Sequence, residues 1–195
     1  MSYKSETFKE EIEFIQDERV KKFVNVALEI LPDYFFKIPS SSSGKYHPAY
    51  ALGEGGLVRH TKACIRIAME LYRLEMFNHF SQLDRDYILA SLILHDGFKN
   101  GRDITNKFSV TDHPLVMAEE IKISPYLANI LQPSEVNVIA DNVVHHMGAF
   151  TKDYKTGVEV LEKPKNKMQN FVHLCDYLAS RKCLEMNFNV KFSPL

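Results

Sequence analysis

The sequence predicts an all-α protein that folds as a single domain. Apolar residues recur at helical spacing along most of the 195 residues, and neither βαβ alternation nor an internal repeat is present. A chain of this length can bury one substantial core but is short for two. We therefore expect one helical bundle over residues 1–195, with N-terminal helices and a loop over 1–44 and the functional core over 45–185.

The first long helix is predicted to begin after Asp17, a favourable N-cap residue, and to stop at Pro32. Its apolar positions form one stripe: Val20, Phe23, Val24, Ala27 and Leu31. Residues 39–56 then form a polar connection, with 40–44 as its softest part. The glycines of residues 53–56, just before the next helix, would let the backbone approach a ligand closely.

Two helices are predicted in the middle of the chain. The first covers about 57–76, and one of its faces carries His60, Cys64, Ile67 and Leu71 at i, i+4, i+7 and i+11. The second starts at Ser81, which has Asp84 three residues later, and runs through apolar residues 89–94 to the doublet His95-Asp96. Gly97 marks its end.

Three further helices follow. One begins at His113 with Pro114 in its first turn, and the last two follow Ser134 and Pro164. Only residues 154–161 have strand character, which allows at most a short β-hairpin in that stretch.

Composition excludes several classes of function. The net charge is −1, so the chain as a whole is not attracted to nucleic acid or to an anionic membrane. No apolar stretch is long enough to span a bilayer, and the N-terminus lacks a signal-peptide pattern. Cys64, Cys175 and Cys183 are scattered and odd in number, which predicts reduced core thiols in a cytoplasmic protein.

Polar, ionisable residues lie on the apolar faces of several of these helices. Singly, each would be a hydrogen-bonded core residue or a helix cap, but burying them unsatisfied would cost on the order of 1–3 kcal/mol apiece and more for the charged ones. If these side chains converge on bound cations, the ions satisfy them and that cost is removed. Of two adjacent histidines, His146 shares the apolar stripe, whereas His145 shares a more polar face and is expected at the rim. The predicted ligands are His60, His95, Asp96, His113, His146 and Asp176.

Six ligands are more than one catalytic ion needs, so a division between two ions is natural. His60, His95, Asp96 and Asp176 would hold one, and His113 with His146 would hold the other, with Asp96 as a bridge. Such ions, about 3.5–4 Å apart, would activate a hydroxide and clamp the oxygens of a phosphoryl transfer. Imidazole and carboxylate ligands are compatible with one or two ions of Fe, Mn, Ni, Co, Zn or Mg.

The ordered set His60, His95-Asp96 and Asp176 resembles the H…HD…D pattern of the HD superfamily of metal-dependent phosphohydrolases. Residues 55–61, Gly-Gly-Leu-Val-Arg-His-Thr, look like the GGLLxHT helix of HD-domain 3′-to-5′ exoribonucleases, and residues 172–181 resemble the closing-aspartate helix of small bacterial and phage HD proteins. His113-Pro114 and His145-His146 look like the subset with a second metal. The likeness covers about residues 47–182.

The resemblance implies an all-helical HD fold and hydrolysis of a phosphomonoester or phosphodiester. It makes Asp96 and Lys99 catalytic, the latter as a cation beside phosphate oxygens in an HDxxK pattern, and His47, Arg59 and Arg181 substrate-binding. Residues 147–150, Met-Gly-Ala-Phe, carry neither HHE nor GYP, which argues against a cyclic-di-GMP phosphodiesterase. The exoribonuclease relatives also carry an OB-type module, and nothing before His47 is long or β-rich enough to be one.

We therefore expect a hydrolase acting on a small phosphorylated substrate, nucleotide-like or a short single strand, through a metal-activated hydroxide. One alternative is a nucleotide-sensing module that binds metal but has little turnover. Another is a structural metal site, although structural zinc sites are usually rich in thiolate and the cysteines here lack that spacing.

Overall fold

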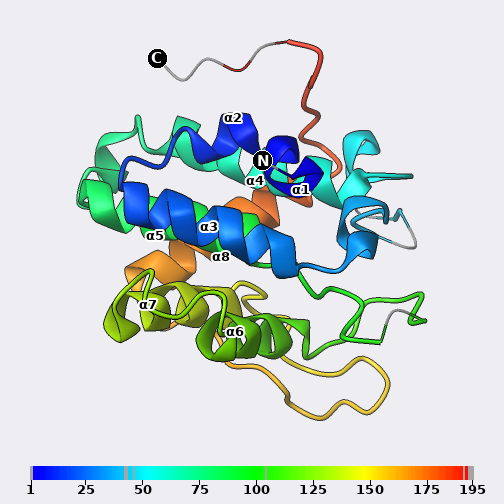
Figure 1. Cartoon of the computed structure of the whole chain (residues 1–195). Helices are drawn as coiled ribbons and strands as arrows, with labels where there is room; N and C mark the ends of the chain where they lie inside the picture. Colours follow the sequence, from blue (N-terminus) through cyan, green and yellow to red (C-terminus); the bar gives the residue numbers. More distant parts are fainter. Residues whose placement is uncertain (1, 42–43, 46, 104, 191, 193–195) are drawn as a thin grey trace.

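Helix α5 (Gln82–Leu94) is the central element of the fold and is almost entirely buried from Asp86 onward. It packs against α3, α4, α7 and α8, while α6 packs against α7 below this layer (Figure 1). We analysed a computed structural model, which describes residues 2–41, 44, 45, 47–103, 105–190 and 192. The other α-helices in this part of the chain are α1 (Tyr3–Thr7), α2 (Lys9–Ile12), α3 (Glu18–Ile30), α4 (Gly56–Leu71), α6 (His113–Ile123), α7 (Pro133–Val144) and α8 (Lys167–Ala179).

The all-α prediction is confirmed. The residues described contain eight α-helices, three short 3-10 turns (Asp33–Phe36, Ala49–Ala51 and Glu75–Phe77) and no β-sheet. The stretch with strand character forms one isolated antiparallel bridge between Lys152 and Glu159. Its alternating side chains find no neighbouring strand in the described structure, and so it remains a loop.

The caps explain where the helices begin. The Asp17 carboxylate accepts hydrogen bonds from the backbone N–H groups of Arg19 and Val20, as an N-cap residue does. Ser81 and Asp84 form the reciprocal capping box expected at the start of α5. The predicted starts of the last two helices were less accurate, because Gln132 caps α7 and Asn166 caps α8.

The polar connection over residues 39–56 packs closely onto α4. Gly56, the first residue of α4, allows this, because a Cβ there would lie 2.3 Å from the carbonyl oxygen of Ala51. Of the expected soft segment, residues 42 and 43 lie outside the described positions. Close approach of the backbone therefore serves the packing of this loop against the helix.

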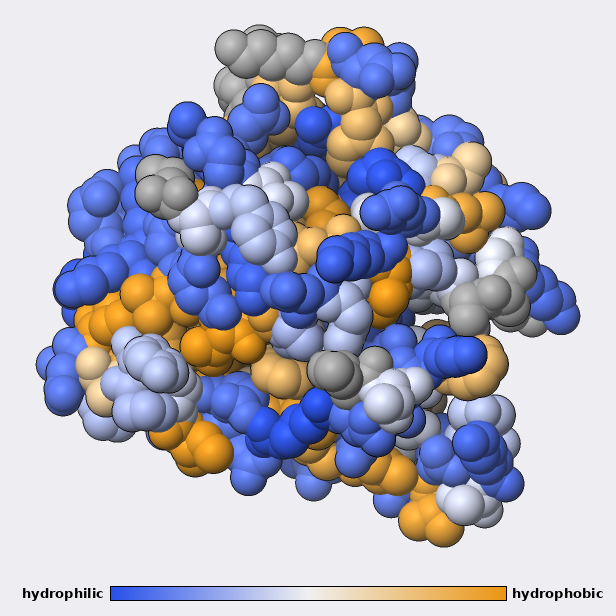
Figure 2. All heavy atoms as spheres, turned by 45° about the vertical axis from the view of Figure 1, so that its right-hand side comes forward, coloured by the Kyte–Doolittle hydropathy of each residue, from blue (hydrophilic) through white to orange (hydrophobic). Residues whose placement is uncertain are grey.

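The three cysteines are free, and Cys64 and Cys175 are buried as predicted. Cys183 is exposed, so the expectation of a core thiol is wrong there: it follows the end of α8, where the chain leaves the bundle. The face in Figure 2 is mostly hydrophilic, with smaller apolar patches. In the part of the chain that the structure describes, no helix has the length and apolar character to cross a membrane.

Candidate metal centre

The fold brings the predicted ligands together at one end of the bundle. His95 and Asp96 follow the last residue of α5, His146 follows the end of α7, and Asp176 lies in the last turn of α8. His60 lies near the start of α4, and His113 is the first residue of α6. Three helix C-termini, with partial negative charge, and the N-terminus of α6, with partial positive charge, therefore meet at the site.

Backbone carbonyl groups orient three of the histidines, two from the last turns of α5 and α7 and one from the loop before α6. The Nδ1 atoms of His95 and His146 lie 2.7 and 2.8 Å from the carbonyl oxygens of Leu92 and Val143. Nδ1 of His113 lies 2.7 Å from the carbonyl oxygen of Val110. We assign the proton to Nδ1 in each ring, because a carbonyl oxygen can only accept. Each Nε2 then presents a lone pair, which is the tautomer that binds metal.

The Asp96 carboxylate lies between two groups of these nitrogen atoms. Its Oδ2 lies 3.5 Å from Nε2 of His95 and 3.9 Å from Nε2 of His60. Its Oδ1 lies 3.0 Å from Nε2 of His113 and 3.7 Å from Nε2 of His146. One oxygen therefore faces each group, as expected of a bridging ligand.

The first group, cluster 1, consists of His60, His95, Asp176 and Oδ2 of Asp96. Oδ1 of Asp176 lies 2.9 Å from Nε2 of His60 and 3.7 Å from Nε2 of His95. Bonds of about 2.1 Å to a common ion would place adjacent ligand atoms roughly 3.0–3.4 Å apart. The observed separations of 2.9–3.9 Å are close to these values, so the cluster could hold one ion with small adjustments.

The second group, cluster 2, consists of His113, His146 and Oδ1 of Asp96. The two Nε2 atoms face each other 3.4 Å apart. Two lone pairs in this position repel, and a cation between them would relieve the repulsion. Burial is the main reason that the pKa of His146 is lowered to about 3, so the ring is neutral at neutral pH and its Nε2 can act as a ligand.

Unpartnered buried atoms support a cation at this centre. Among the described residues, Nε2 of His95 and Oδ1 of Asp96 make no hydrogen bond, although both side chains are almost fully buried. Burial by itself would raise the pKa of Asp96, but the charge of the neighbouring Lys99 ammonium is the largest of the opposing effects, which together hold that pKa well below its usual value. A carboxylate ionised in the core beside three lone-pair nitrogens is a donor set suited to a divalent metal.

Solvent reaches the centre beside Asp176 and Lys99, whose side chains are 18% and 14% exposed. Lys99 Nζ lies 2.5 Å from Oδ2 of Asp96. His47 is half-buried, with its ring centroid 5.8 Å from that of His60. Burial first, and then the charges of His60 and Lys99, lower the pKa of His47 to about 4.

The two arginines expected to bind substrate make hydrogen bonds within the protein. Arg59 donates from Nε and Nη2 to the carbonyl oxygens of Tyr50 and Leu52, 2.5 and 2.8 Å away, and so fastens the preceding loop to α4. Arg181 stacks its guanidinium 4.3 Å from the ring centroid of Tyr177 and donates to that residue's carbonyl oxygen. Both guanidinium groups thus have structural contacts.

The structure separates His145 from both clusters and adds one residue that the sequence did not single out. Nε2 of His145 is buried without a hydrogen bond in the described structure and lies 3.9 Å from Glu162.

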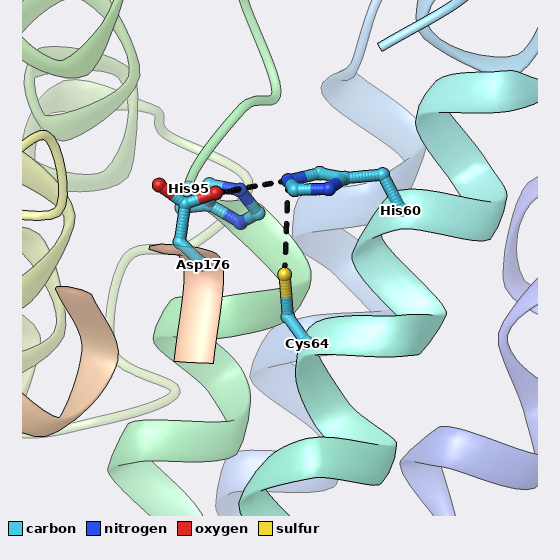
Figure 3. Close-up of side chains that lie close together, drawn as sticks. All are labelled: His60, Cys64, His95 and Asp176. Carbon is cyan, nitrogen blue, oxygen red and sulfur yellow. Dashed lines mark hydrogen bonds and ion pairs between the residues drawn. The ribbon is translucent and has the colours of Figure 1, made fainter. Parts of the chain in front are cut away.

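Cys64, interpreted from the sequence as a core thiol, lies close to cluster 1, with its Sγ 3.7 Å from Nε2 of His60 (Figure 3). The helical signal was present in the sequence, because Cys64 follows His60 by four residues.

Comparison of this chain with protein-family models, curated proteins and solved structures finds no match. The buried histidine, aspartate and cysteine side chains could hold a metal ion.

Proposed function

We propose that this chain is a metal-dependent phosphohydrolase of the HD type, acting on a nucleotide or a short single-stranded oligonucleotide. The observation that carries the proposal is the position of Asp96, with one carboxylate oxygen toward each of two histidine groups. This arrangement is suited to two adjacent ions, and two-metal sites of this kind promote in-line displacement at phosphorus.

The residues of the chain provide fixed geometry and charge. Bound divalent ions would supply Lewis acidity toward phosphoryl oxygens and increase the acidity of water. His95, His113 and His146 are held by backbone carbonyl groups, so their nitrogen atoms need little reorganisation to act as ligands. Asp96 and Asp176 supply negative charge that holds cations in a buried environment.

Lys99 is proposed to contact the transferred phosphoryl group. It is partly exposed at the solvent-facing side of the site, and its ammonium contacts the bridging carboxylate. Its three N–H donors could pair with phosphate oxygens while the charge stabilises the transition state. Lys99→Met should lower kcat by roughly 10²-fold, the effect of removing one such stabilising donor.

His47 is proposed to bind substrate as a neutral imidazole. Burial lowers the pKa of this ring to about 4, which favours the neutral form at pH 7. Nδ1 of His47 is buried and makes no hydrogen bond within the described residues. A substrate hydroxyl or base that displaces the covering atoms would give this nitrogen the hydrogen-bond partner that it lacks.

A small substrate is favoured by charge and access. The net charge of −1 supplies no long-range attraction for a nucleic-acid polymer. The ligands other than Asp176 are nearly buried, so the reacting phosphate has to enter at the side of Asp176 and Lys99. Free thiols are consistent with a reducing cytoplasm as the place of action.

The test combines elemental analysis with turnover of a panel of phosphomonoesters, nucleotides and short single strands. Protein reconstituted with Mn²⁺ or Fe²⁺ should bind about two ions per chain and release phosphate or nucleoside products. Asp96→Asn should lose activity and most of the metal. Tight nucleotide binding without product would instead indicate a sensing module, and absence of both metal and turnover would refute the proposal.

Asp86→Asn is the matched control. Asp86 is also a buried carboxylate of α5, but it accepts hydrogen bonds from the backbone N–H groups of Gln16 and Asp17 at the other end of the helix. The control should lower stability and keep the metal content. If both variants lose metal equally, general unfolding and not ligand loss explains the effect of Asp96→Asn.

A further inference from the structure

We propose that Cys64 is a thiolate ligand of the ion in cluster 1, which makes this a mixed imidazole, carboxylate and thiolate site. This inference rests on the proposed function only in that it requires an ion in cluster 1. Cys64 lies one helical turn after His60 on α4 and is fully buried. Figure 3 shows its sulfur directed toward the space between His60, His95 and Asp176.

The position of the sulfur agrees with coordination. With Cys64 added, cluster 1 would offer five ligand atoms; metal–sulfur and metal–nitrogen bonds of about 2.3 and 2.1 Å at angles of about 90–120° place the sulfur and nitrogen atoms about 3.1–3.8 Å apart. Sγ of Cys64 lies 3.7 Å from Nε2 of His60. Ligand atoms of Cys64, His60, His95 and Asp176 all lie within 4.8 Å of one another. No large backbone movement is needed to bring the four atoms onto one ion.

The surroundings of Cys64 distinguish it from an ordinary core thiol. Buried cysteine usually packs as a small apolar residue. Cys64 instead borders the unpartnered Nε2 of His95, which is fully buried, and the carboxylate of Asp176. Cys175 is equally buried, yet in the described structure it belongs to neither of the groups that could hold a metal.

A thiolate ligand changes which metals the site prefers. Sulfur is a soft ligand that binds Zn²⁺, Fe²⁺ and Co²⁺ well, whereas Mg²⁺ prefers oxygen ligands. On binding, the thiol releases its proton to solvent, so the ligand set of cluster 1 gains one negative charge. We therefore expect cluster 1 to select a borderline transition metal and cluster 2, which lacks sulfur, to be less selective.

Cobalt spectroscopy tests the proposal without relying on turnover. The wild-type protein titrated with Co²⁺ should show visible ligand-field bands from the bound ion and a near-ultraviolet thiolate-to-cobalt charge-transfer band. Cys64→Ser should keep the visible bands and lose the near-ultraviolet band. Its Co²⁺ affinity should fall on the order of tenfold, since even changes around the direct ligands have effects of that size. Cys64→Ala provides the same test without a hydroxyl.

Cys175→Ser is the matched control and should keep both sets of bands. Visible bands without the near-ultraviolet band in the wild-type protein would overturn the role of Cys64 and leave the metal centre intact. A near-ultraviolet band that persists in both Cys64 variants would assign the sulfur to another cysteine and also overturn the proposal. Absence of any bound cobalt, checked by elemental analysis, would reject the metal centre itself.

Discussion

Gly148→Ala should destabilise the protein by an amount that the structure allows to be estimated. Gly148 has φ +62°, in the left-handed region, and lies two residues after His146. A Cβ at this position would lie 2.1 Å from Cε1 of His173, so the ring would have to move. That movement would break the hydrogen bond from Nδ1 of His173 to the carbonyl oxygen of His146, which is 2.8 Å long.

Two contributions add to the expected loss. An alanine in the left-handed conformation costs about 1–2 kcal/mol, and overpacking of a buried position costs roughly a further 1–3 kcal/mol. Gly157 allows the backbone contribution to be measured without the overpacking contribution, because it has φ +71° and no atom lies within 4 Å of where its Cβ would be. Gly157→Ala should therefore show the backbone contribution alone, about 1–2 kcal/mol.

Urea unfolding followed by far-ultraviolet circular dichroism measures both variants. The free energy of unfolding of Gly148→Ala should be lower than that of Gly157→Ala by roughly 1–3 kcal/mol. Equal losses would show that His173 moves freely, and the argument from packing would fail. Because the displaced bond holds the carbonyl group of His146, Gly148→Ala should also bind the ion of cluster 2 more weakly.

Further predictions concern a buried carboxylate, pH and metal removal. Asp86→Asn should lower the free energy of unfolding, measured in urea, by about 1–3 kcal/mol. An amide has only one acceptor oxygen, whereas the backbone N–H groups of Gln16 and Asp17 each need an acceptor. An unchanged midpoint of urea unfolding would contradict this. Hydrogen bonds from the backbone of Gln132 and from Tyr87 hold the pKa of Glu135 below its usual 4.5, so its contribution to stability is present above that pH and is lost as pH falls through the lowered value. Glu135→Gln should thus be less stable than wild type at pH 7, and the difference should shrink toward pH 3; a constant difference would exclude this linkage. Chelation of an ion present at 100 times its Kd should remove about 2.7 kcal/mol and lower the Tm by roughly 5–11 °C, and Asp96→Asn should not respond to the chelator.

Helix periodicity carried most of the fold prediction. Asp17, Ser81 and Asp84 predicted two helix starts because side-chain caps act locally and require only neighbouring backbone N–H groups. Periodicity also distinguished His146 from His145, and the structure places Nε2 of His146 beside Asp96, with His145 near Glu162. These distinctions follow from a single helix and do not require knowledge of its partners.

Features that depend on tertiary packing were not predictable. The bonds from Arg59 to two loop carbonyls depend on how residues 50–52 fold against α4. A thiol on an apolar stripe looks like core until α8 places Asp176 beside it, so the spacing of Cys64 four residues after His60 did not by itself identify it as a candidate ligand. The strand-like alternation near residue 157 depends on a partner strand, and among the described residues only an isolated bridge forms.

The spacing of the ligands along the sequence determines which of the two clusters can form first during folding. His113, His146 and Asp96 of cluster 2 lie on neighbouring elements, and α6 packs directly against α7. Cluster 1 instead joins His60 to Asp176, 116 positions apart, and is complete only when α8 docks on α4. Closing so long a loop is a late and slow event in a folding chain. A nascent chain without α8 could then assemble cluster 2 but not cluster 1, so the two halves of the centre would mature at different stages of synthesis.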